Sequence, residues 1–398
     1  MYKAYAKKAY YYDVRSLYPK AMCNLMPLKL IETIYNPALD KFNLDSFFGF
    51  IDLVIECPDS VINPVLPFKY KHRTIFPRGR FSGVYFSEEI KDVIKLGYKI
   101  ISIKTAKRFT SGYIFNDYVK EMYTIKCNSI GSERWIAKLL LNSLYGIFGR
   151  KQETLRTITI NNYELPVYLT CCIVKSISKI NDQRSMLLIE GNVNKQIMKQ
   201  LNATFTQLTS IDSPVKANVA IASAITSYAR IFMNQFKQNH YIIYTDTDSI
   251  ITTQPLPEHL LGSELGMFND ELNGCMIEEI YVLGIKQYGY WFYDKEGHRI
   301  EKSVWAGIQR NSLSFSEIES LFNGAKIVKK SDGRFFKSIS ELNISVKSVN
   351  TTIVFNPHQR MIGVNYKDLF INNESNDPLL LKLSSYINRI KRNLSIVR

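Results

Sequence analysis

The sequence has few of the residues that usually hold transition metals. Its 398 residues include six cysteines and five histidines, and no two cysteines have the C-x-x-C spacing of a zinc site. The histidines are scattered along the chain. A zinc site therefore has no support, and buried or indifferent thiols in a reducing compartment are the simpler hypothesis. The cysteines are Cys23, Cys57, Cys127, Cys171, Cys172 and Cys275.

Long apolar runs are also missing. None reaches the ~18–20 residues that a transmembrane helix needs. The first residues, MYKAYAKKAYYYDV, lack the apolar stretch and the small-residue cleavage site of a secretory signal. Internal repeats and low-complexity linkers do not occur either. The sequence therefore gives no support to a membrane-spanning, a secreted or a repeat protein.

What is present is apolar, aromatic and basic. Hydrophobic residues make up 46% of the chain, with 25 Tyr and 22 Phe, which is enough for a large core and more than one domain. The net charge is +15 and the sequence pI is near 9.3. A folded, strongly basic chain most often meets nucleic acid or an acidic membrane surface, although basicity alone is weak evidence.

Hydrophobic periodicity predicts a mixture of strands and helices. Strands are predicted over residues 9–13, 46–57 and 279–293, and strand-like patterns occur in TLRTITI and YLTCCIVKSI between residues 150 and 215. Helices are predicted over residues 87–97, 113–149 and 216–238. Ser87 is the expected N-cap of the first helix, and Gly97 its end. The tail from about residue 309 mixes both patterns.

Residues 240–252, HYIIYTDTDSIIT, place two acids at the tip of a predicted hairpin. Both flanks are rich in Ile and Tyr, as in buried strands. Asp246 and Asp248 carry like charges one residue apart, so each resists the ionisation of the other. A purely structural turn would more naturally use Asn-Gly or Asp-Gly. A solvated loop is the simpler interpretation of one such turn taken alone.

A further acid, Asp13, ends a predicted strand in the segment DVRSLYP, residues 13–19. The chain then turns into a short helix, and the amide groups of such a turn suit a triphosphate. Alone, Asp13 is more simply a strand-end or N-cap aspartate. Together with Asp246 and Asp248 it could cage divalent metal, because Mg²⁺ prefers one or two carboxylates, water and phosphate. Two ions about 3.5–4 Å apart can activate an attacking hydroxyl and stabilise a leaving pyrophosphate.

A third segment, KLLLNSLYG, residues 138–146, puts polar groups on one face of a predicted helix. At about 100° per residue, Lys138, Asn142 and Tyr145 share that face, and Arg134 lies on it one turn earlier. Cations, an amide and a phenol can grip phosphates at one end and stack on a base at the other. A solvated charged face is the usual alternative.

Two expectations accompany this helix. Its start is expected at residues 129–132, which leaves Lys126 upstream, where it could extend the cationic surface. The apolar side chains Leu139, Leu140 and Leu144 are expected to be buried elsewhere.

In this order, the three segments resemble motifs A, B and C of the family B DNA polymerases. The matches are D-x-x-S-L-Y-P, K-x-x-x-N-S-x-Y-G and Y-x-D-T-D-S. PRGRFSGVYFSEEI, ANVAIASAITSYARI, ELGMFNDEL and KQYGYW further resemble the protein-primed subgroup of small phages, adenoviruses and linear plasmids, above all the mitochondrial plasmid enzymes. The resemblance covers nearly the whole chain and thins beyond about residue 325.

The resemblance implies an α+β, right-hand polymerase fold with an antiparallel-sheet palm, fingers, a thumb and two terminal-protein-region insertions. The first insertion would orient a priming protein and help hold DNA, and the second would help encircle the template and support strand displacement. The implied boundaries are palm at 1–24 and 214–305, insertions at 25–112 and 150–213, fingers at 113–149 and thumb at 306–398.

The resemblance also implies residue roles. Asp13 and Asp248 would be the main metal ligands, with Asp246 as a supporting carboxylate and Val14 at the same metal site. Tyr18 would be the steric gate that excludes a ribose 2′-OH. The residues implied to hold the triphosphate are Lys126, Arg134 and Lys138, and those implied to line the nascent base pair are Asn142 and Tyr145, with Gly146 allowing close approach.

Lys286 and Tyr288 match the K-x-Y motif that contacts the primer terminus in this family. Without the family context, an ordinary surface lysine on a strand explains Lys286 about as well. Two positions depart from the pattern. Arg15 stands in a variable slot where many relatives carry Asn, and Arg134 replaces a frequent Lys, whose ammonium is not equivalent to a planar guanidinium.

A larger departure concerns proofreading. Relatives carry an exonuclease domain, marked by D-x-E, before motif A, whereas only twelve residues precede Asp13. The D-x-E at Asp294–Glu296 lies after the motifs, in a predicted hairpin turn, and is rejected as an exonuclease site. No 3′–5′ exonuclease is therefore expected here. The chain resembles the C-terminal polymerase part of a longer protein, or a truncated reading frame.

The leading hypothesis is a template-directed DNA polymerase that adds dNTPs to a primer 3′-OH or a terminal-protein hydroxyl. It would use two Mg²⁺ ions, or Mn²⁺ in their place, and its partners would be template and primer DNA, dNTPs and a terminal protein, without a membrane. The resemblance and an Ile-, Asn-, Lys- and Tyr-rich composition suggest replication of a linear plasmid in mitochondria, with an organelle- or plasmid-borne gene.

Two alternatives remain open. The first is an inactive remnant that binds DNA, and the intact motifs argue against it. The second is an RNA-dependent or RNA-making polymerase, and Tyr18 argues against ribonucleotide use. Primer extension with Mg²⁺, with dNTPs and then with rNTPs, distinguishes the three hypotheses.

Overall fold

The computed structural model describes residues 4–70, 73–150, 155–190, 195–200, 217–338 and 343–355. The chain divides into two compact units. One contains residues 1–145, 220–325 and 354–398, and the other contains residues 146–219 and 326–353. Among the described residues, no helix combines the length and the apolar character needed to cross a bilayer.

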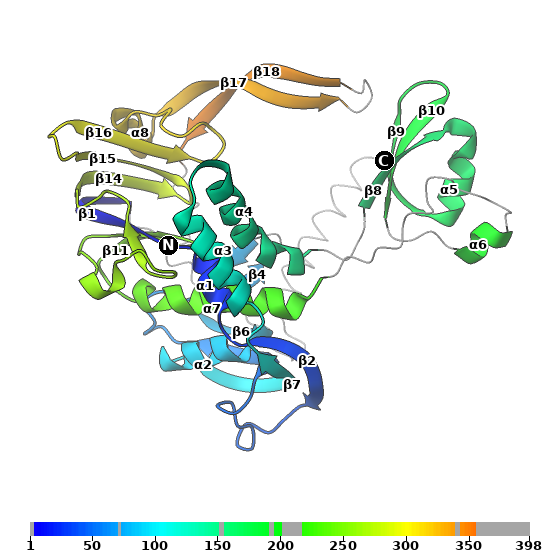
Figure 1. Ribbon diagram of the computed structural model, residues 1–398, viewed down its shortest axis with the longest axis horizontal. Helices are drawn as coiled ribbons and strands as arrows, with labels where there is room; N and C mark the ends of the chain where they lie inside the picture. Colours follow the sequence, from blue (N-terminus) through cyan, green and yellow to red (C-terminus); the bar gives the residue numbers. More distant parts are fainter. Residues whose placement is uncertain are drawn as a thin grey trace, which may run out of the picture. The chain divides into compact units, whose positions relative to one another are not determined.

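A seven-stranded antiparallel sheet forms the centre of the first unit (Figure 1). Its order is β11-β12-β1-β14-β15-β16, and β13 also pairs with β1. The strands are β1 (Tyr5–Val14), β11 (Ile242–Asp246), β12 (Ser249–Thr252), β13 (Phe268–Asp270), β14 (Ile277–Gly284), β15 (Gln287–Tyr293) and β16 (Arg299–Trp305). Alternate apolar residues of these strands, among them Ala9, Ile243, Ile251 and Ile280, pack into one core.

This sheet confirms the strand predicted at residues 9–13 and the hairpin predicted at residues 240–252. The strand-like pattern over residues 279–293 is confirmed by β14 and β15, which form a hairpin whose turn the sequence pattern did not indicate. Lys286 is the second central residue of the turn and has a φ of 55°, in the left-handed region that usually favours Gly or Asn. Apolar residues on both sides of a two-residue turn look like a single strand in the sequence.

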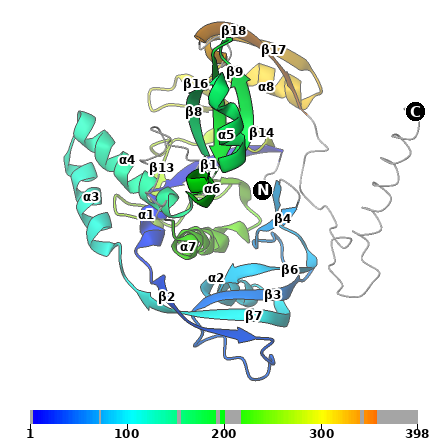
Figure 2. The ribbon, with the colours of Figure 1, turned by 90° about the vertical axis from the view of Figure 1, so that its right-hand side faces the viewer.

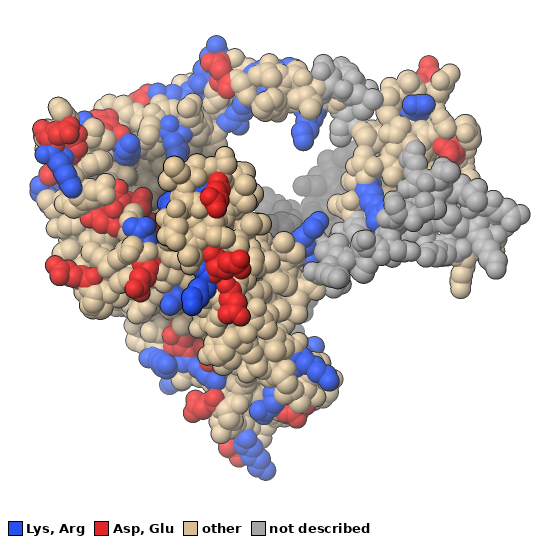
Figure 3. All heavy atoms as spheres, viewed as in Figure 1, with Lys and Arg blue, Asp and Glu red and all other residues tan. Residues whose placement is uncertain are grey.

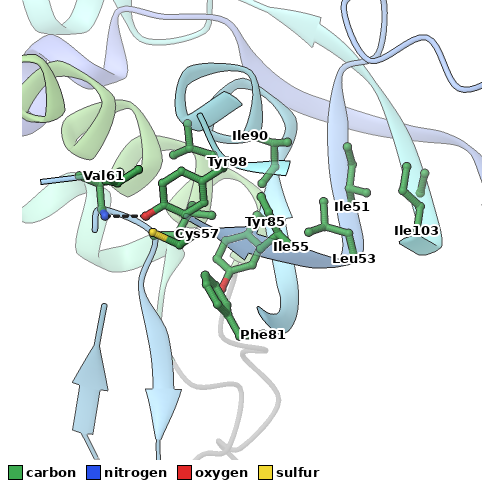
Figure 4. Packing of buried hydrophobic residues seen from close by; sticks show 14 of the residues in the cluster. Ile51, Leu53, Ile55, Cys57, Val61, Phe81, Tyr85, Ile90, Tyr98 and Ile103 are labelled. Carbon is green, nitrogen blue, oxygen red and sulfur yellow. Dashed lines mark hydrogen bonds between the residues drawn. The ribbon is translucent and has the colours of Figure 1, made fainter. Parts of the chain in front are cut away.

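A second sheet, of four strands, contains most of the predicted first insertion. Its order is β2-β7-β3-β6, with β2 (Met26–Tyr35), β3 (Gly49–Cys57), β6 (Gly79–Phe86) and β7 (Lys99–Gly112). Helix α2 (Ser87–Lys95) contributes Ile90 and Val93 to the same core. Tyr98 points into this core, where its hydroxyl accepts a hydrogen bond of 3.0 Å from the Val65 N–H (Figure 4).

Two predictions about α2 have different outcomes. Gly97 has a φ of 101° and follows the last turn, which confirms it as the end of the helix. Ser87 is not the N-cap, because the helix begins at Ser87 and the cap position is Phe86. The Ser87 hydroxyl instead accepts a hydrogen bond of 3.1 Å from the Gly49 N–H of β3, so it joins the helix to the sheet.

Helix α7 (Val219–Lys237) confirms the helix predicted over residues 216–238. It lies between the seven-stranded sheet and α2 in both ribbon views (Figures 1 and 2). Phe236 packs edge-on against Phe268 of β13 on one side. On the other side, Arg230 and Asn234 bond to α2.

The region predicted to be helical over residues 113–149 contains two helices, α3 (Asn116–Asn128) and α4 (Gly131–Phe148). The start predicted for the second helix at residues 129–132 is confirmed. The predicted burial of two leucines was wrong, because Leu139 is 49% exposed and Leu140 is 42% exposed. Only Ala137 and Leu141 of α4 are buried among the described residues, so this helix packs through a narrow stripe.

The second unit begins inside α4. It contains the sheet β8-β10-β9, with β8 (Leu155–Asn161), β9 (Ile173–Lys179) and β10 (Arg184–Glu190). Its short helices are η1 (Asn162–Glu164), α5 (Leu165–Cys171) and α6 (Lys195–Gln200). It also contains the hairpin of β17 (Lys326–Ser338) and β18 (Asn343–Val354). The strand pattern predicted in TLRTITI is confirmed by β8. In YLTCCIVKSI the prediction was wrong for residues 168–171, which belong to α5, where Pro166 favours the first turn of a helix.

The remaining elements are short. They are α1 (Leu17–Met22), β4 (Phe68–Tyr70), β5 (Arg73–Ile75), η2 (Glu258–Leu260) and α8 (Phe315–Phe322). A capping box at Ser314 and Glu317 begins α8, which packs on β14 and β15 through Phe315, Ile318 and Leu321. The mixed pattern predicted from residue 309 is confirmed as far as residue 355, and residues 356–398 lie outside the described part of the chain.

Candidate active site

Asp13 and Asp248 meet where β1 ends beside the β11–β12 turn. In the register of the sheet, Asp13 is opposite Ser249, the residue that follows Asp248. The Val14 N–H donates a hydrogen bond of 2.9 Å to the Asp248 carbonyl oxygen. This bond connects the segment DVRSLYP to the β11–β12 hairpin. Thr247, at the tip of the turn, has a φ of 56°. Antiparallel pairing therefore brings together carboxylates that lie 235 positions apart in the sequence.

These carboxylates resist ionisation. Burial, followed by the charges of Asp248 and Glu271, raises the pKa of Asp13 to about 7, although Lys138 acts in the opposite direction. Burial and the charge of Asp246 also raise the pKa of Asp248. Several half-buried acids facing one another form an oxygen-rich, electron-rich site. This donor set fits a hard divalent cation, whose charge would offset the repulsion.

Asp246 has a different partner from Asp248. The Lys286 ammonium lies 2.6 Å from the Asp246 Oδ2 atom, and the Lys286 N–H donates to the Tyr244 hydroxyl at 2.9 Å. The β14–β15 turn therefore directs Lys286 at the tip of the β11–β12 hairpin. Its location in a turn excludes the alternative of an ordinary lysine on a strand. Because it is paired with Lys286, Asp246 is less available than Asp248 to bind a metal ion.

Tyr288 follows Lys286 by two residues and is the second residue of β15. It is 7% exposed and belongs to the core of the seven-stranded sheet, where its ring centroid is 5.3 Å from that of Tyr244. Its predicted contact with a primer stays a prediction, and the described structure gives it a packing role beneath Lys286.

Helices α3 and α4 bring cations to the acids. The Lys126 ammonium donates a hydrogen bond of 2.9 Å to the Ser16 hydroxyl, in the turn that follows Asp13. Burial lowers the pKa of Lys126, and the charges of Lys138, Arg134 and Arg15 lower it further. Arg134 also donates to the Lys126 carbonyl oxygen at 2.7 Å. The predicted cations Lys126, Arg134 and Lys138 are therefore close enough to interact, and such a cluster suits a polyphosphate.

Tyr18 and Tyr145 form an aromatic pair beside these cations. Their rings stack with centroids 4.2 Å apart and planes 7° apart, which joins α1 to α4. Asn142 is exposed on α4. A Cβ atom added at Gly146 would meet no described protein atom within 4 Å, so the protein leaves that position open. The predicted stripe of Arg134, Lys138, Asn142 and Tyr145 is present on one helix.

Two residues of the site were not assigned a role from the sequence. Glu271 follows β13, and the pairing of β13 with β1 brings its charge close enough to Asp13 to raise the pKa of Asp13. Arg15 donates through Nε to the Gly262 carbonyl oxygen at 2.7 Å and also bonds the Asn269 side chain. The sequence shows Glu271 only as one of the acids in ELGMFNDEL. The register of the sheet is needed to show that it lies near Asp13.

The rejected D-x-E segment is confirmed as a turn. Asp294 accepts hydrogen bonds from the N–H groups of Glu296 and His298 at 3.0 and 2.8 Å, which closes the connection between β15 and β16. Asp294, Glu296 and His298 could together approach a cation, but Glu296 and His298 are exposed and their geometry is that of the turn itself.

The family is decided by comparison of the whole sequence. Residues 1–243 match the model of the DNA polymerase type B family, organellar and viral. The chain belongs to this family. Its curated relatives include a probable DNA polymerase of Podospora anserina, 31% identical over 88% of this chain and 30% of that protein, and one of Neurospora intermedia, 30% identical over 89% of this chain and 36% of that protein. The chain spans about a third of the length of these relatives.

Solved polymerase structures have a similar fold. A phi29 DNA polymerase complexed with primer-template DNA and incoming nucleotide matches with a TM-score of 0.62 and 17% identity, over 89% of this chain and 59% of that chain. A phi29 DNA polymerase complexed with single-stranded DNA matches with a TM-score of 0.59 and 18% identity, over the same shares of the two chains. The predicted α+β polymerase fold with an antiparallel central sheet is therefore confirmed.

Proposed function

We propose that this type B family member is a template-directed DNA polymerase that joins dNTPs to a primer 3′-OH. The observation that carries the proposal is the convergence of three segments. Asp13 and Asp248 form an acidic site in the sheet, and α3 and α4 bring Lys126 and Lys138 to it. An acidic site beside a cationic cluster suits a metal-bound triphosphate, because each end of the ligand finds the opposite charge.

Asp13 and Asp248 would hold divalent metal, with the Val14 backbone at the same place. When bound, such ions polarise the attacking hydroxyl and stabilise the pyrophosphate that leaves. We take Mg²⁺ as the physiological ion, in two copies, with Mn²⁺ as a substitute. Asp246 would act indirectly, because its carboxylate is already paired with Lys286. Glu271 would add negative charge on the side of Asp13.

The chain's other residues would bind and orient the nucleotide. Lys126, Arg134 and Lys138 would neutralise the triphosphate, and Tyr18 would close the space next to the sugar C2′. The Tyr18 ring is stacked against Tyr145, which limits its movement, so a 2′-OH would clash with the ring. Asn142, Tyr145 and Gly146 would face the nascent base pair, and Lys286 with Tyr288 would support the primer terminus.

The biological setting is a further part of the proposal. Initiation on a terminal-protein hydroxyl is supported by the resemblance of the sequence to the protein-primed subgroup. The match to the organellar and viral family and the fungal relatives support an organellar setting, and the same resemblance supports a linear mitochondrial plasmid as the template. The segment predicted as a first insertion, with sheet β2-β7-β3-β6, would carry part of the surface for the priming protein.

Primer extension tests the central claim. The protein is given a primed template, dNTPs and Mg²⁺, and Asp248→Ala is compared with Asp182→Ala, whose carboxylate is 95% exposed in the second unit. Wild type and Asp182→Ala should extend the primer, and Asp248→Ala should lose at least about 1000-fold in rate. Wild-type protein that binds the primed template without extending it would establish the inactive remnant instead. Extension with rNTPs as readily as with dNTPs would favour the RNA-making alternative.

A further inference from the structure

Helix α3 carries Lys126 to the motif A turn, although little of the helix is packed against the rest of the protein. Among the described residues of α3, only Val119 is buried. A helix with so small an apolar contact is held weakly by packing, so its polar contacts largely decide where it lies. Those contacts reach a loop of the same unit, residues 262–267, that has no part in the proposed reaction.

One hydrogen bond attaches α3 to this 262–267 loop. The Tyr123 hydroxyl donates a hydrogen bond of 2.8 Å to the Ser263 carbonyl oxygen. Tyr123 lies three residues before Lys126, and the Lys126 ammonium is 5.0 Å from the centroid of the Tyr123 ring, so both side chains share one face of α3. The Lys126 ammonium also donates to the Ser16 hydroxyl at 2.9 Å. Tyr123 therefore anchors the face of α3 that presents Lys126 to motif A.

The 262–267 loop is also bound to motif A. The Arg15 N–H donates a hydrogen bond of 2.9 Å to the Met267 carbonyl oxygen, and the Gly266 N–H donates one of 2.9 Å to the Arg15 carbonyl oxygen. Gly266 has a φ of 87°, and a Cβ atom there would lie 2.7 Å from the Lys20 side chain of α1. Glycine therefore permits both the backbone conformation of the loop and its close approach to α1.

The Arg15 side chain holds the part of the loop to which α3 is attached. Its Nε atom donates a hydrogen bond of 2.7 Å to the Gly262 carbonyl oxygen, one residue before the acceptor of the Tyr123 hydroxyl. Another nitrogen of the guanidinium bonds the side-chain oxygen of Asn269 in β13. A planar guanidinium with two such partners has one orientation, which the compact ammonium of a lysine does not reproduce.

We propose that Tyr123 and Arg15 are positioning residues for Lys126. The 262–267 loop is the site on which α3 docks, and docking places Lys126 at the triphosphate. Arg15 holds the loop against motif A, and the loop accepts the hydrogen bond of Tyr123. Both residues act through Lys126 and not on the reacting atoms. The inference rests on the proposed function, because it takes the ligand of Lys126 to be the triphosphate of a dNTP.

The expected effect is on nucleotide binding rather than on the chemical step. Without its hydrogen bond to the loop, α3 leaves the docked position more often, and Lys126 leaves Ser16 with it. The incoming triphosphate must then bring the helix back, which uses part of the binding free energy and raises the KM for dNTPs. Once the nucleotide is bound, the helix lies where it does in wild type, so kcat changes little.

Helix α3 offers a matched control. Tyr118 lies on the same helix and is also half-buried, but its hydroxyl has no hydrogen-bond partner among the described residues. Tyr118→Phe and Tyr123→Phe each remove one hydroxyl and keep the ring. A general effect of losing a tyrosine hydroxyl from α3 therefore predicts the same kinetics from both variants.

The experiment measures kcat and KM for single-nucleotide insertion by the full chain. Tyr123→Phe should raise the KM for the dNTP by about threefold to tenfold, a usual effect of losing one hydrogen bond, with kcat within about twofold of wild type. Tyr118→Phe should leave both constants unchanged. In a Lys126→Ala background, Tyr123→Phe should have no further effect, because the group it positions is gone.

Three results would overturn the proposal. They are an unchanged KM in Tyr123→Phe, an equal rise of KM in Tyr118→Phe, and a full additional effect of Tyr123→Phe in the Lys126→Ala background. Each would show that the hydroxyl does not act through Lys126.

Arg15→Lys tests the contribution of the loop. It keeps the positive charge and loses the two-point contact with Gly262 and Asn269, so it should raise the KM as Tyr123→Phe does. The two substitutions together should have less than the product of their separate effects, because both release the same docked helix. A wild-type KM in Arg15→Lys would show that Arg15 does not position the loop. Tyr123→Phe removes a single hydroxyl and decides the proposal if Arg15→Lys does not fold.

Failure of the proposed function would give a separate result. With a dideoxy-terminated primer, equilibrium binding gives the Kd of the dNTP without catalysis. A wild-type chain that binds the dNTP but extends nothing contradicts the polymerase proposal, and the ratio of the Kd values of Tyr123→Phe and wild type still decides the role of Tyr123. A chain that binds no dNTP overturns both proposals.

Discussion

At the scale of the residue, Lys237 shows most clearly how burial and charge conflict in this chain. Burial, followed by the charge of Arg230, lowers the pKa of Lys237 to about 8. The negative charge of Glu89 raises the pKa of Lys237 only partly, because that carboxylate already accepts two hydrogen bonds from the Arg230 guanidinium. The folded protein therefore carries the Lys237 ammonium at a cost at neutral pH.

The resulting prediction concerns stability against pH. The folded pKa lies below the unfolded value, so the unfolded chain binds more protons between about pH 8 and 10.5, and the free energy of unfolding rises through this window. Relative to wild type, Lys237→Met should raise the free energy of unfolding by about 1–3 kcal/mol at pH 7. The increase should be smaller at pH 9.5, where Lys237 of the folded wild type is mostly neutral. Urea unfolding at both pH values measures it, with Lys295→Met in an exposed turn as the control. A less stable Lys237→Met would contradict the cost assigned to the ammonium.

Tyr18 is the second residue with a sharp prediction. Tyr18→Val removes the ring, so the dNTP/rNTP ratio of kcat/KM should fall at least about tenfold, which corresponds to roughly 1.4 kcal/mol of discrimination. The use of dNTPs should fall only modestly. Tyr18→Phe keeps the ring and its stack on Tyr145, and should keep the selectivity. Unchanged selectivity in Tyr18→Val would show that another group excludes the 2′-OH.

At the scale of the element, periodicity identified most of the segments that bear the site. The buried strands β1, β11 and β12 and the helices α4 and α7 were predictable, because they alternate or repeat apolar residues with a clear period. Tight turns were the weak point. The two central residues of the β14–β15 turn, Ile285 and Lys286, are neither Gly nor Asn, so the strand-like pattern did not show where one strand ends and the next begins. Leu139 and Leu140 were wrongly predicted to be buried because α4 offers only a narrow face to its neighbours.

The α4 helix carries a prediction of its own. Its residue Lys138 is close enough to Asp13 and Lys126 for its charge to lower the pKa of both, so a triphosphate bound there would interact with that charge. Lys138→Ala should raise the KM for dNTPs and lower kcat/KM by about tenfold to 100-fold. Steady-state kinetics of single-nucleotide insertion measures both, with exposed Lys120→Ala on α3 as the control. Equal effects of the two substitutions would indicate only general loss of positive charge.

At the scale of the whole molecule, charge is unevenly distributed. The hairpin β17–β18 has more basic than acidic residues, and Lys and Arg side chains are visible along it in Figure 3. The basic residues in the sequences of these two strands are Lys326, Lys329, Lys330, Arg334, Lys337 and Lys347. The predicted domain boundaries stay predictions, and the division at residue 146 begins one unit close to the predicted second insertion at 150–213.

This distribution predicts that DNA binding depends steeply on salt. Each phosphate neutralised on a duplex releases counterions, so the logarithm of the binding constant should fall linearly with the logarithm of salt concentration, by about 0.9 per contact. Fluorescence anisotropy with a primed template between 50 and 300 mM salt, roughly the range over which counterion release is evident, measures the slope. Lys337→Ala should reduce the slope by about one if the hairpin contacts DNA. A salt-insensitive affinity would contradict a basic DNA-binding surface.

The sequence by itself determined which chemical groups this protein can use. The order and spacing of DVRSLYP, KLLLNSLYG and YTDTDS indicated a group of acids and a cationic helix face, because these patterns depend on local residue types. The resemblance to the polymerase family added the predicted roles of metal ligands and of an aromatic gate. Tertiary structure decided which groups face one another. The pairing of Asp246 with Lys286, the approach of Glu271 to Asp13 and the contact of Glu89 with Arg230 join residues 40 to 258 positions apart in the sequence. Such contacts depend on strand register and helix packing, so local sequence patterns cannot predict them.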